Sequence, residues 1–309
     1  IDPLPDQNGD LDWGDGREVR LVYRPASDLI VSLGARYGET NGGTPWARRQ
    51  EVADNYCVHF GGSCNANSLI ISPVNYSISD LREGEDHTVV EFLVGQEIGF
   101  GGLDESSLSA GVRYAELGSE TSAHIFGQTN WNIPPEEGNP LKYFVQNTTF
   151  DQYDATLAAA REFEGAGPVL SWEASKALLG GPETGALRLD WSVTGGALFG
   201  KRKTVVEIGD EAIAHRFTAV GIFLGTVIND QPQTRTITPA TTLVRSESVT
   251  VPTYGASLGL SYKIGGFKIG TGYRWERYDD AIDGGFMEAE DADRTIDGPY
   301  FKIAVGFGG

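Results

Sequence analysis

The sequence has few cysteines, few cations and no long apolar run, and each shortage excludes a class of protein. Lys and Arg number 24 against 43 Asp and Glu, so the formal net charge is −19, and binding to nucleic acid is not expected. A membrane-spanning helix needs about 18 consecutive apolar residues, whereas the longest candidate, Ala219 to Ile228, already contains Gly and Thr. Helical membrane proteins are therefore excluded. A membrane β-barrel is not, because its strands alternate apolar and polar residues.

The chain has only two cysteines, Cys57 and Cys64, close together in a stretch rich in Gly, Asn and Ser. This spacing predicts a disulfide that closes a loop in an oxidising compartment, and two unpaired thiols are the alternative. A metal site at the cysteines is not expected, because only His59 lies nearby. The chain opens with Ile1-Asp2-Pro3 and has no secretory signal, which we interpret as a processed or trimmed form.

What the sequence does contain is period-two alternation of apolar and polar residues, the pattern of β-strands. Glycine is also abundant, with 41 residues. The alternation predicts nine strands, at 17–26, 29–37, 90–100, 108–115, 170–178, 187–199, 254–264, 267–276 and 301–307. The segment 204–230 is a candidate for further strands. An even number would need a strand before residue 1, or 17–39 as one long interrupted strand, so counts from 8 to 12 stay open.

The predicted connections are short at one end and long at the other. Tight hairpins are expected near 25–28, 101–106, 179–185 and 265–266, and long polar, acidic loops at 40–86, 128–150, 201–248 and 279–296. Outer-membrane barrels have this asymmetry, with short periplasmic turns and long extracellular loops. We predict an acidic N-terminal segment over 1–16 and a single β-barrel domain over 17–307.

Two all-β folds share this alternation, a soluble β-sandwich or calyx and a membrane barrel with its apolar face toward lipid. The polar faces are rich in Gly, Ser and Ala, with charges of both signs, which suits a barrel lumen. Aromatic residues recur near the ends of the apolar faces, as interfacial girdles require; they are Tyr23, Tyr37, Tyr114, Tyr254, Tyr262, Tyr273 and Trp275. We therefore predict a transmembrane, antiparallel, up-and-down β-barrel in the bacterial outer membrane.

The inward faces of such a barrel would carry charges that line a pore. Nine of these residues are basic and five are acidic, so the predicted net charge of the lumen is +4. They are Arg20, Arg24, Arg36, Arg113, Arg188, Lys263, Lys268, Arg274, Lys302, Glu91, Glu97, Glu173, Asp190 and Glu276. Opposed charges could set pore size and ion selectivity. The alternative is a narrow lumen filled by salt-bridged side chains that conducts little.

Two acidic stretches are candidate cation-binding sites. Asp6, Asn8, Asp10 and Asp12 have the alternate spacing of the first half of a calcium loop. However, Leu11 replaces the expected glycine, so a solvated acidic segment is the alternative. The acidic run 279–297 is interpreted as a solvated loop, with divalent ions that bridge it to lipopolysaccharide as the other reading.

Nothing in the sequence predicts an enzyme. His59, His87, His124 and His215 are scattered in or beside the expected loops, and there is no Gly-x-Ser-x-Gly elbow, phosphate loop or dinucleotide fingerprint.

Five short stretches together resemble one family, the Legionella major outer membrane protein-like, pore-forming β-barrels of Gram-negative bacteria. They occur in the family's order across roughly 90–307; they are Leu108-Ser109-Ala110-Gly111-Val112-Arg113-Tyr114-Ala115, Phe163-Glu164-Gly165-Ala166-Gly167-Pro168, Gly195-Gly196-Ala197-Leu198-Phe199-Gly200, Gly272-Tyr273-Arg274-Trp275-Glu276 and Asp297-Gly298-Pro299-Tyr300-Phe301. The resemblance implies an outer-membrane pore or surface barrel and no catalytic residues.

The leading functional hypothesis is a passive pore for small solutes or ions. The alternative is a non-conducting barrel that serves as a structural anchor or partner-binding platform through its acidic loops. A soluble lipid-binding calyx is a third hypothesis. The expected partners are outer-membrane lipid and lipopolysaccharide, with a protein partner or a homo-oligomer as further candidates.

Overall fold

The chain folds into one antiparallel β-sheet. The computed structural model describes residues 14–24, 29–43, 47–52, 56–58, 69–99, 103–132, 144–181, 184–222 and 225–305. The strands are β1 (Asp15–Tyr23), β2 (Leu29–Gly42), β3 (Ala47–Val52), β4 (Tyr56–Val58), β5 (Leu69–Glu97), β6 (Glu105–Asn132), β7 (Phe144–Gly181), β8 (Gly185–Ile222), β9 (Gly225–Ile264), β10 (Phe267–Asp283) and β11 (Asp291–Val305). In the described residues there is no helix long and apolar enough to cross a membrane.

The strands follow one another up and down in chain order. The path is β1-β2-β5-β6-β7-β8-β9-β10-β11, and the short strands β3 and β4 pair with β5 outside it. The nine strands of this path correspond to the nine predicted from alternation, so the predicted fold class is confirmed. The alternative of a single strand over 17–39 is wrong, because Asp15 to Tyr23 pairs antiparallel with Val31 to Glu39.

The predicted long loops are mostly strand, and the sequence interpretation ended these strands too early. Within 201–248, β8 continues to Ile222 and β9 begins at Gly225, and β5 already begins at Leu69 within the expected loop 40–86. The candidate segment 204–230 does contribute strand, as predicted, since it lies in β8 and β9. Backbone pairing with neighbouring strands continues through the other parts as well. Within 128–150, β6 continues to Asn132 and β7 begins at Phe144, and in 279–296 only 284–290 lies between strands.

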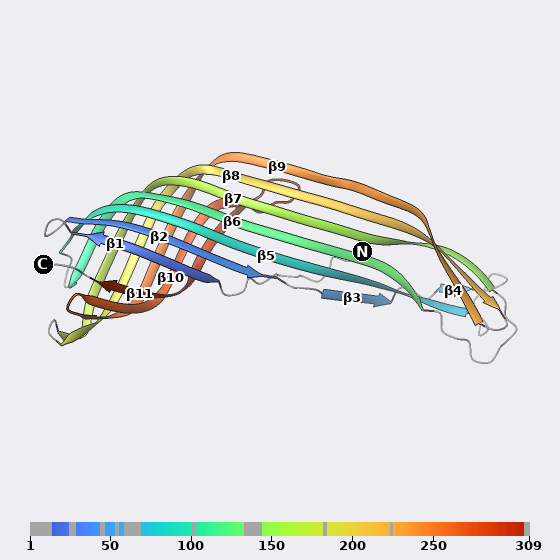
Figure 1. Cartoon of the computed structure of the whole chain (residues 1–309), viewed down its shortest axis with the longest axis horizontal. Helices are drawn as coiled ribbons and strands as arrows, with labels where there is room; N and C mark the ends of the chain where they lie inside the picture. Colours follow the sequence, from blue (N-terminus) through green and yellow to red (C-terminus); the bar gives the residue numbers. More distant parts are fainter. Residues whose placement is uncertain are drawn as a thin grey trace.

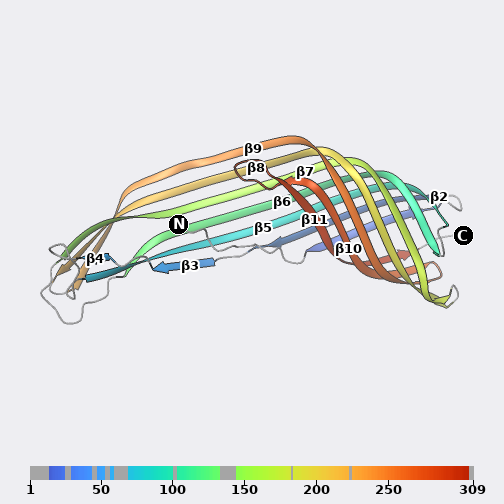
Figure 2. The same ribbon diagram turned by 180° about the vertical axis from the view of Figure 1, so that it is seen from behind.

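The paired strands are much longer than a membrane is thick. β7 and β8 have 38 residues each and β9 has 40, or roughly 125 Å at about 3.3 Å per residue. The apolar band of an outer-membrane barrel is only about 25 Å tall. Figures 1 and 2 show β5 to β9 running far past the short β10–β11 hairpin. The molecule is thus an open, barrel-like sheet with a long, curved extension.

The apolar faces point outward and the polar faces inward, as predicted for a membrane barrel. Leu21, Val112, Leu170 and Leu258 are more than half exposed, whereas Arg113 on an inward face is 1% exposed. A protein surrounded by water buries the opposite set.

The outward apolar band ends at the same kind of residue on most strands. On these strands the first charged outward residues beyond the apolar band are Glu39, Asp86, Glu116, Glu164, Lys201, Arg277 and Asp297. Girdle tyrosines donate hydrogen bonds across this boundary, Tyr37 to Glu39 at 2.7 Å and Tyr114 to Glu164 at 3.1 Å. A phenol that keeps its ring in the apolar band and its hydroxyl in the polar zone suits a membrane interface.

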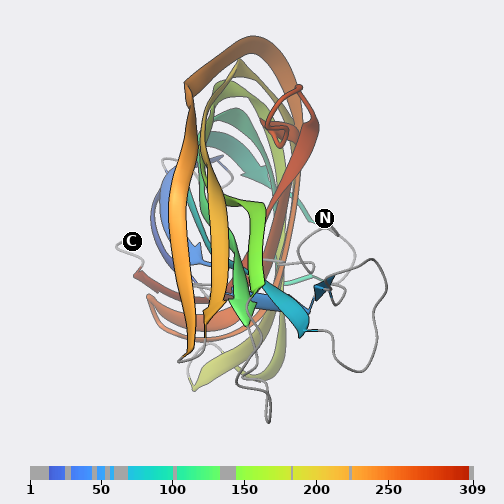
Figure 3. The ribbon, with the colours of Figure 1, turned by 90° about the vertical axis from the view of Figure 1, so that its right-hand side faces the viewer.

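The sheet has two free edges. Among the described residues no backbone pairing joins β1 to β11, so the sheet curves round an axis without closing (Figure 3). Nine alternating strands make the two edge strands run in the same direction. The predicted segment 1–16 overlaps β1 at Asp15, and residues 1–13 lie outside the described residues.

Candidate functional site: the interior of the barrel

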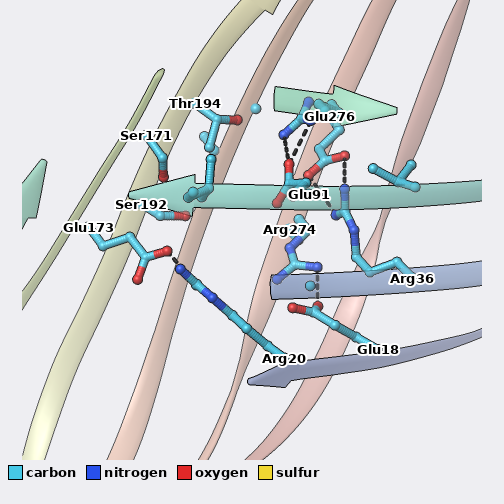
Figure 4. A pocket seen from close by; sticks show the side chains of 16 residues that line it. Glu18, Arg20, Arg36, Glu91, Ser171, Glu173, Ser192, Thr194, Arg274 and Glu276 are labelled. Atoms are coloured by element: carbon cyan, nitrogen blue, oxygen red, sulfur yellow. Dashed lines mark hydrogen bonds and ion pairs between the residues drawn. The ribbon is translucent and has the colours of Figure 1, made fainter. Parts of the chain in front are cut away.

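The inward faces of the spanning strands surround a small charged cavity, which we call the charged chamber. Its volume is about 50 Å³, and its ionised lining residues are Glu18, Arg20, Arg36, Glu91, Arg113, Glu173, Arg274 and Glu276. The hydroxyls of Ser171, Ser192 and Thr194 lie on the wall formed by β7 and β8 (Figure 4). Period-two alternation places these polar residues inside, because their apolar neighbours face outward.

The centre of the charged chamber is a network around Glu276 on β10. Arg36 from β2 donates to both oxygens of Glu276, at 2.6 and 2.7 Å, and the Tyr278 hydroxyl donates to it at 3.2 Å. Beside it, Arg113 Nε donates to Glu91 at 2.6 Å. Bidentate, buried pairs of this kind have well-defined geometry, so the network holds β2, β5, β6 and β10 at one level.

Two further pairs join strands that are not neighbours. Arg20 on β1 reaches Glu173 on β7 at 2.5 Å, and Arg274 on β10 reaches Glu18 on β1 at 2.5 Å (Figure 4). The first contact crosses the bore, and the second bridges the gap between the free edges.

A second group of ion pairs lies toward the short turns. Lys263 contacts Glu105 at 2.7 Å, and Arg188 lies 3.5 Å from the same carboxylate. Lys268 contacts Asp190 at 2.9 Å, and Arg24 contacts Glu97 at 3.3 Å. The bore is therefore crossed by charged side chains at two levels.

Every predicted pore-lining residue but one makes an ion pair, and the partners correct the predicted charge. Three carboxylates were missed, Glu18, Asp104 and Glu105, so eight acidic groups face the nine cations and the lumen is not +4. Glu18 lies two residues before Arg20 in the predicted strand 17–26, so the period of two could have placed it inside. Asp104 and Glu105 lay in an expected turn, where no sequence signal placed them inside. Within the described part of the chain, Lys302 has no ion-pair partner.

Beyond the charged chamber, away from the short turns, the interior is apolar, which the sequence reading did not predict. The members of this apolar layer are Val89, Ala115, Leu117, Phe163, Leu198, Val251, Tyr278, Ala281 and Ile282. Phe163, Leu117 and Leu198 are 0% exposed. The sequence did contain a signal for this layer, because Val89-Val90 and Leu198-Phe199 are pairs of adjacent apolar residues. Such a pair places an apolar side chain on each face of the strand, as in strands that have apolar surroundings on both faces.

The β10–β11 hairpin ends in a segment, residues 279–293, that we call the hairpin tip. Its Asp283 is 2% exposed and accepts hydrogen bonds from Arg245 Nε at 2.7 Å and from the N–H groups of Gly285 and Glu290 at 3.0 Å. Burial by itself would raise the pKa of Asp283, but these hydrogen bonds outweigh it and hold the pKa below its usual value of 3.8.

Three inward arginines of the long strands, the arginine clamp, hold the hairpin tip. Arg202 donates to the carbonyls of Asp280 and Ile282 at 3.0 and 3.1 Å. Arg245 donates to the carbonyls of Gly285 and Phe286 at 2.6 and 3.1 Å. Arg161 donates to the Gly284 carbonyl at 3.3 Å, and its guanidinium lies 4.9 Å from the centre of the Phe286 ring.

Most of the other candidate sites fall on residues that the structure does not describe. Cys57 is on β4, but Cys64 falls outside the described residues, so the disulfide stays a prediction. The calcium candidates Asp6, Asn8, Asp10 and Asp12 also fall outside them. His124 contacts Asp154 at 2.8 Å on the exposed outward face of the extension. No group of three or more His, Cys, Asp or Glu able to hold a metal occurs in the part of the chain that the structure describes.

A family comparison agrees with this inside-out arrangement. Residues 58–307 match the model of the Legionella pneumophila major outer membrane protein precursor. The chain belongs to this family. The match begins before residue 90, so it includes part of β4 and all of β5 as well as the five resembling stretches. Membership in the Legionella major outer membrane protein family places the protein in the bacterial outer membrane, as predicted. No curated protein and no solved structure matches the chain significantly.

Proposed function

We propose that the protein is a narrow outer-membrane pore through which ions and small solutes pass by diffusion. The observation that carries the proposal is the charged chamber, a cavity of about 50 Å³ lined by ionised and hydroxyl side chains inside a curved sheet with an apolar exterior. Polar groups of this kind replace part of an ion's hydration shell, and opposed charges set selectivity. Membership in a major outer membrane protein family supports the same function, and catalysis forms no part of the proposal.

Reconstitution into planar bilayers tests this proposal. We expect discrete conductance steps. Glu173→Gln should shift the reversal potential toward greater anion selectivity, because Glu173 lines the charged chamber and its side chain is 37% exposed. The matched control is Glu164→Gln, which removes the same charge from the outward face of the same strand and should leave selectivity unchanged. Silence under conditions where a known porin conducts would contradict the proposal.

A second candidate is a non-conducting barrel that serves as an anchor or a platform for a protein partner. The apolar layer favours it, because its members are buried apolar side chains that offer ions no polar lining at that level. The extended β5–β9 sheet would then be the working surface, with outer-membrane lipid and lipopolysaccharide around the barrel. A partner that co-purifies at fixed stoichiometry and is lost when the hairpin within 201–248 is shortened would support it. Conductance unaffected by that change, with no partner, would count against it.

A further inference from the structure

The hairpin tip is attached to the rest of the sheet by side chains and not by backbone pairing. β10 pairs with β9 only as far as Tyr278, opposite Thr253, while its pairing with β11 continues to Asp283. Beyond Tyr278 the two strands form a ribbon whose outer edges have no backbone partner in the described residues. A two-stranded ribbon has little stability of its own, so its position depends on what its side chains touch.

The ribbon bends at a distinct point. Its register shifts between Tyr278 and Ile282, and Asp280 adopts a φ of 54°, in the left-handed region that residues other than glycine rarely occupy. Past this bend the chain turns into the bore, where Ala281 is 0% and Ile282 is 6% exposed. Strained residues at such bends mark places where a segment is held by its surroundings.

The bent segment contacts the interior of the sheet at the end of the bore away from the short turns. Ala281 and Ile282 pack into the apolar layer with Tyr278, directly above the charged chamber. On the other side, the arginine clamp caps five carbonyls of the hairpin tip, and Arg202 also pairs with Asp291 at 2.6 Å. Burial lowers the pKa of Arg202, but its hydrogen bonds to Asp291 and Glu247 outweigh this and leave the pKa above the usual arginine value, so Arg202 stays charged.

We propose that the hairpin tip is a gate of the bore, closed here by the arginine clamp and opened by rotation of residues 279–293 about the bend at Asp280. The inference rests on the proposed pore, since it states what interrupts and restores the conducting path. Opening withdraws Ala281 and Ile282 from the apolar layer and connects the charged chamber to the exterior. The fold at and below Tyr278 stays in place, because the β9–β10 pairing ends there.

The experiment compares the clamp with a matched control. The clamp variant Arg202→Gln with Arg245→Gln removes two charges that hold the hairpin tip. The control variant Lys201→Gln with Lys203→Gln removes the same charge from outward residues beside Arg202. Both are made in a Cys57→Ser, Cys64→Ser background that also carries Ser171→Cys, a position that lines the charged chamber and is 2% exposed. Heat-modifiable gel mobility verifies that each variant folds.

Two readouts separate the gate from the pore. They are open probability in planar bilayers and the rate at which a charged thiol reagent labels Ser171→Cys in liposomes. The clamp variant should raise both at least about tenfold, since charge-assisted hydrogen bonds hold the closed form. Equal labelling and conductance in clamp and control variants would overturn the gate and leave the pore standing. Faster labelling without conductance in any variant would uphold the gate and overturn the proposed pore.

Discussion

At the scale of single residues, the interior depends on charges that satisfy one another. Arg113 is 1% exposed and Glu276 is 5% exposed, and a buried charge is tolerated only with a partner of opposite sign. The ion pairs therefore specify how the inward faces meet, whether or not they add net stability.

Replacing Glu276 tests this dependence. Glu276→Gln leaves Arg36 without its bidentate partner, and removing one member of a buried pair costs about 3–5 kcal/mol. We expect a clear loss of resistance to urea, followed by circular dichroism in detergent. Glu173→Gln is the control, because the pair of Glu173 with Arg20 is more exposed and should cost about 1 kcal/mol or less. Equal losses in the two variants would contradict this account.

Asp283 should make the hairpin tip sensitive to acid. Its pKa in the closed form lies below the usual value of 3.8, so its ionised form stabilises the closed tip. That stabilisation is complete above pH 3.8 and disappears as the pH falls through the lowered pKa. Labelling of Ser171→Cys, measured relative to the Asp283→Asn variant at the same pH, should therefore accelerate only as the pH falls below 3.8. In the Asp283→Asn variant, Ser171→Cys should already be labelled fast at pH 5, and acid should cause no further opening of the hairpin tip through residue 283. The same dependence of labelling on pH with and without Asp283→Asn would refute the role of Asp283.

At the scale of the strand, the inward glycines allow close approach of neighbouring backbones. A Cβ built on Gly196 would lie 2.5 Å from the carbonyl oxygen of Pro168 on β7, whereas one on the adjacent Gly195 meets nothing within 4 Å. Strand curvature in a narrow barrel brings the backbones together at such positions.

The two neighbouring glycines form a matched test. Gly196→Ala must push β7 and β8 apart and should destabilise the barrel by about 1–3 kcal/mol. Gly195→Ala should change stability by less than about 0.5 kcal/mol. The stability of each variant is measured as the temperature at which its folded, fast-migrating band is lost on gels. A Gly195 variant as unstable as the Gly196 variant would point to glycine flexibility and not to close contact.

At the scale of the whole molecule, the free edges need closure. The outward side chains of Leu21 and Phe301 are 66% and 67% exposed and apolar, which puts both edge strands in the hydrocarbon region. There, unpaired backbone groups cost several kcal/mol each. The contact between Glu18 and Arg274 at 2.5 Å already brings β1 within side-chain reach of the β10–β11 hairpin.

We expect β1 and β11 to pair in parallel in the membrane and close a nine-stranded barrel. Leu21→Cys combined with Phe301→Cys or Ile303→Cys, in the Cys57→Ser, Cys64→Ser background, should form a disulfide within one chain on mild oxidation. Leu21→Cys with Leu258→Cys, on β9, is the control and should not. Cross-links only between two chains would show instead that a second copy fills the gap.

The sequence by itself determined the local features of this protein. Alternation predicted all nine strands of the main path, the outward apolar band with girdle residues such as Tyr37 and Tyr114, and the inward position of charges such as Arg36 and Glu276. These follow from neighbouring residues on one strand, because side chains point to opposite faces with period two.

The tertiary structure alone decided which inward residues meet. The ion pairs of Glu18 and Glu105, the apolar layer around Phe163 and the inward fold of residues 279–293 all depend on contacts between strands far apart in the chain. The extension of β5 to β9 depends likewise on backbone pairing between strands, and the pattern of side chains indicated only its part within 204–230. Contacts across the bore arise only when the sheet curves, and that curvature is a property of all the strands together.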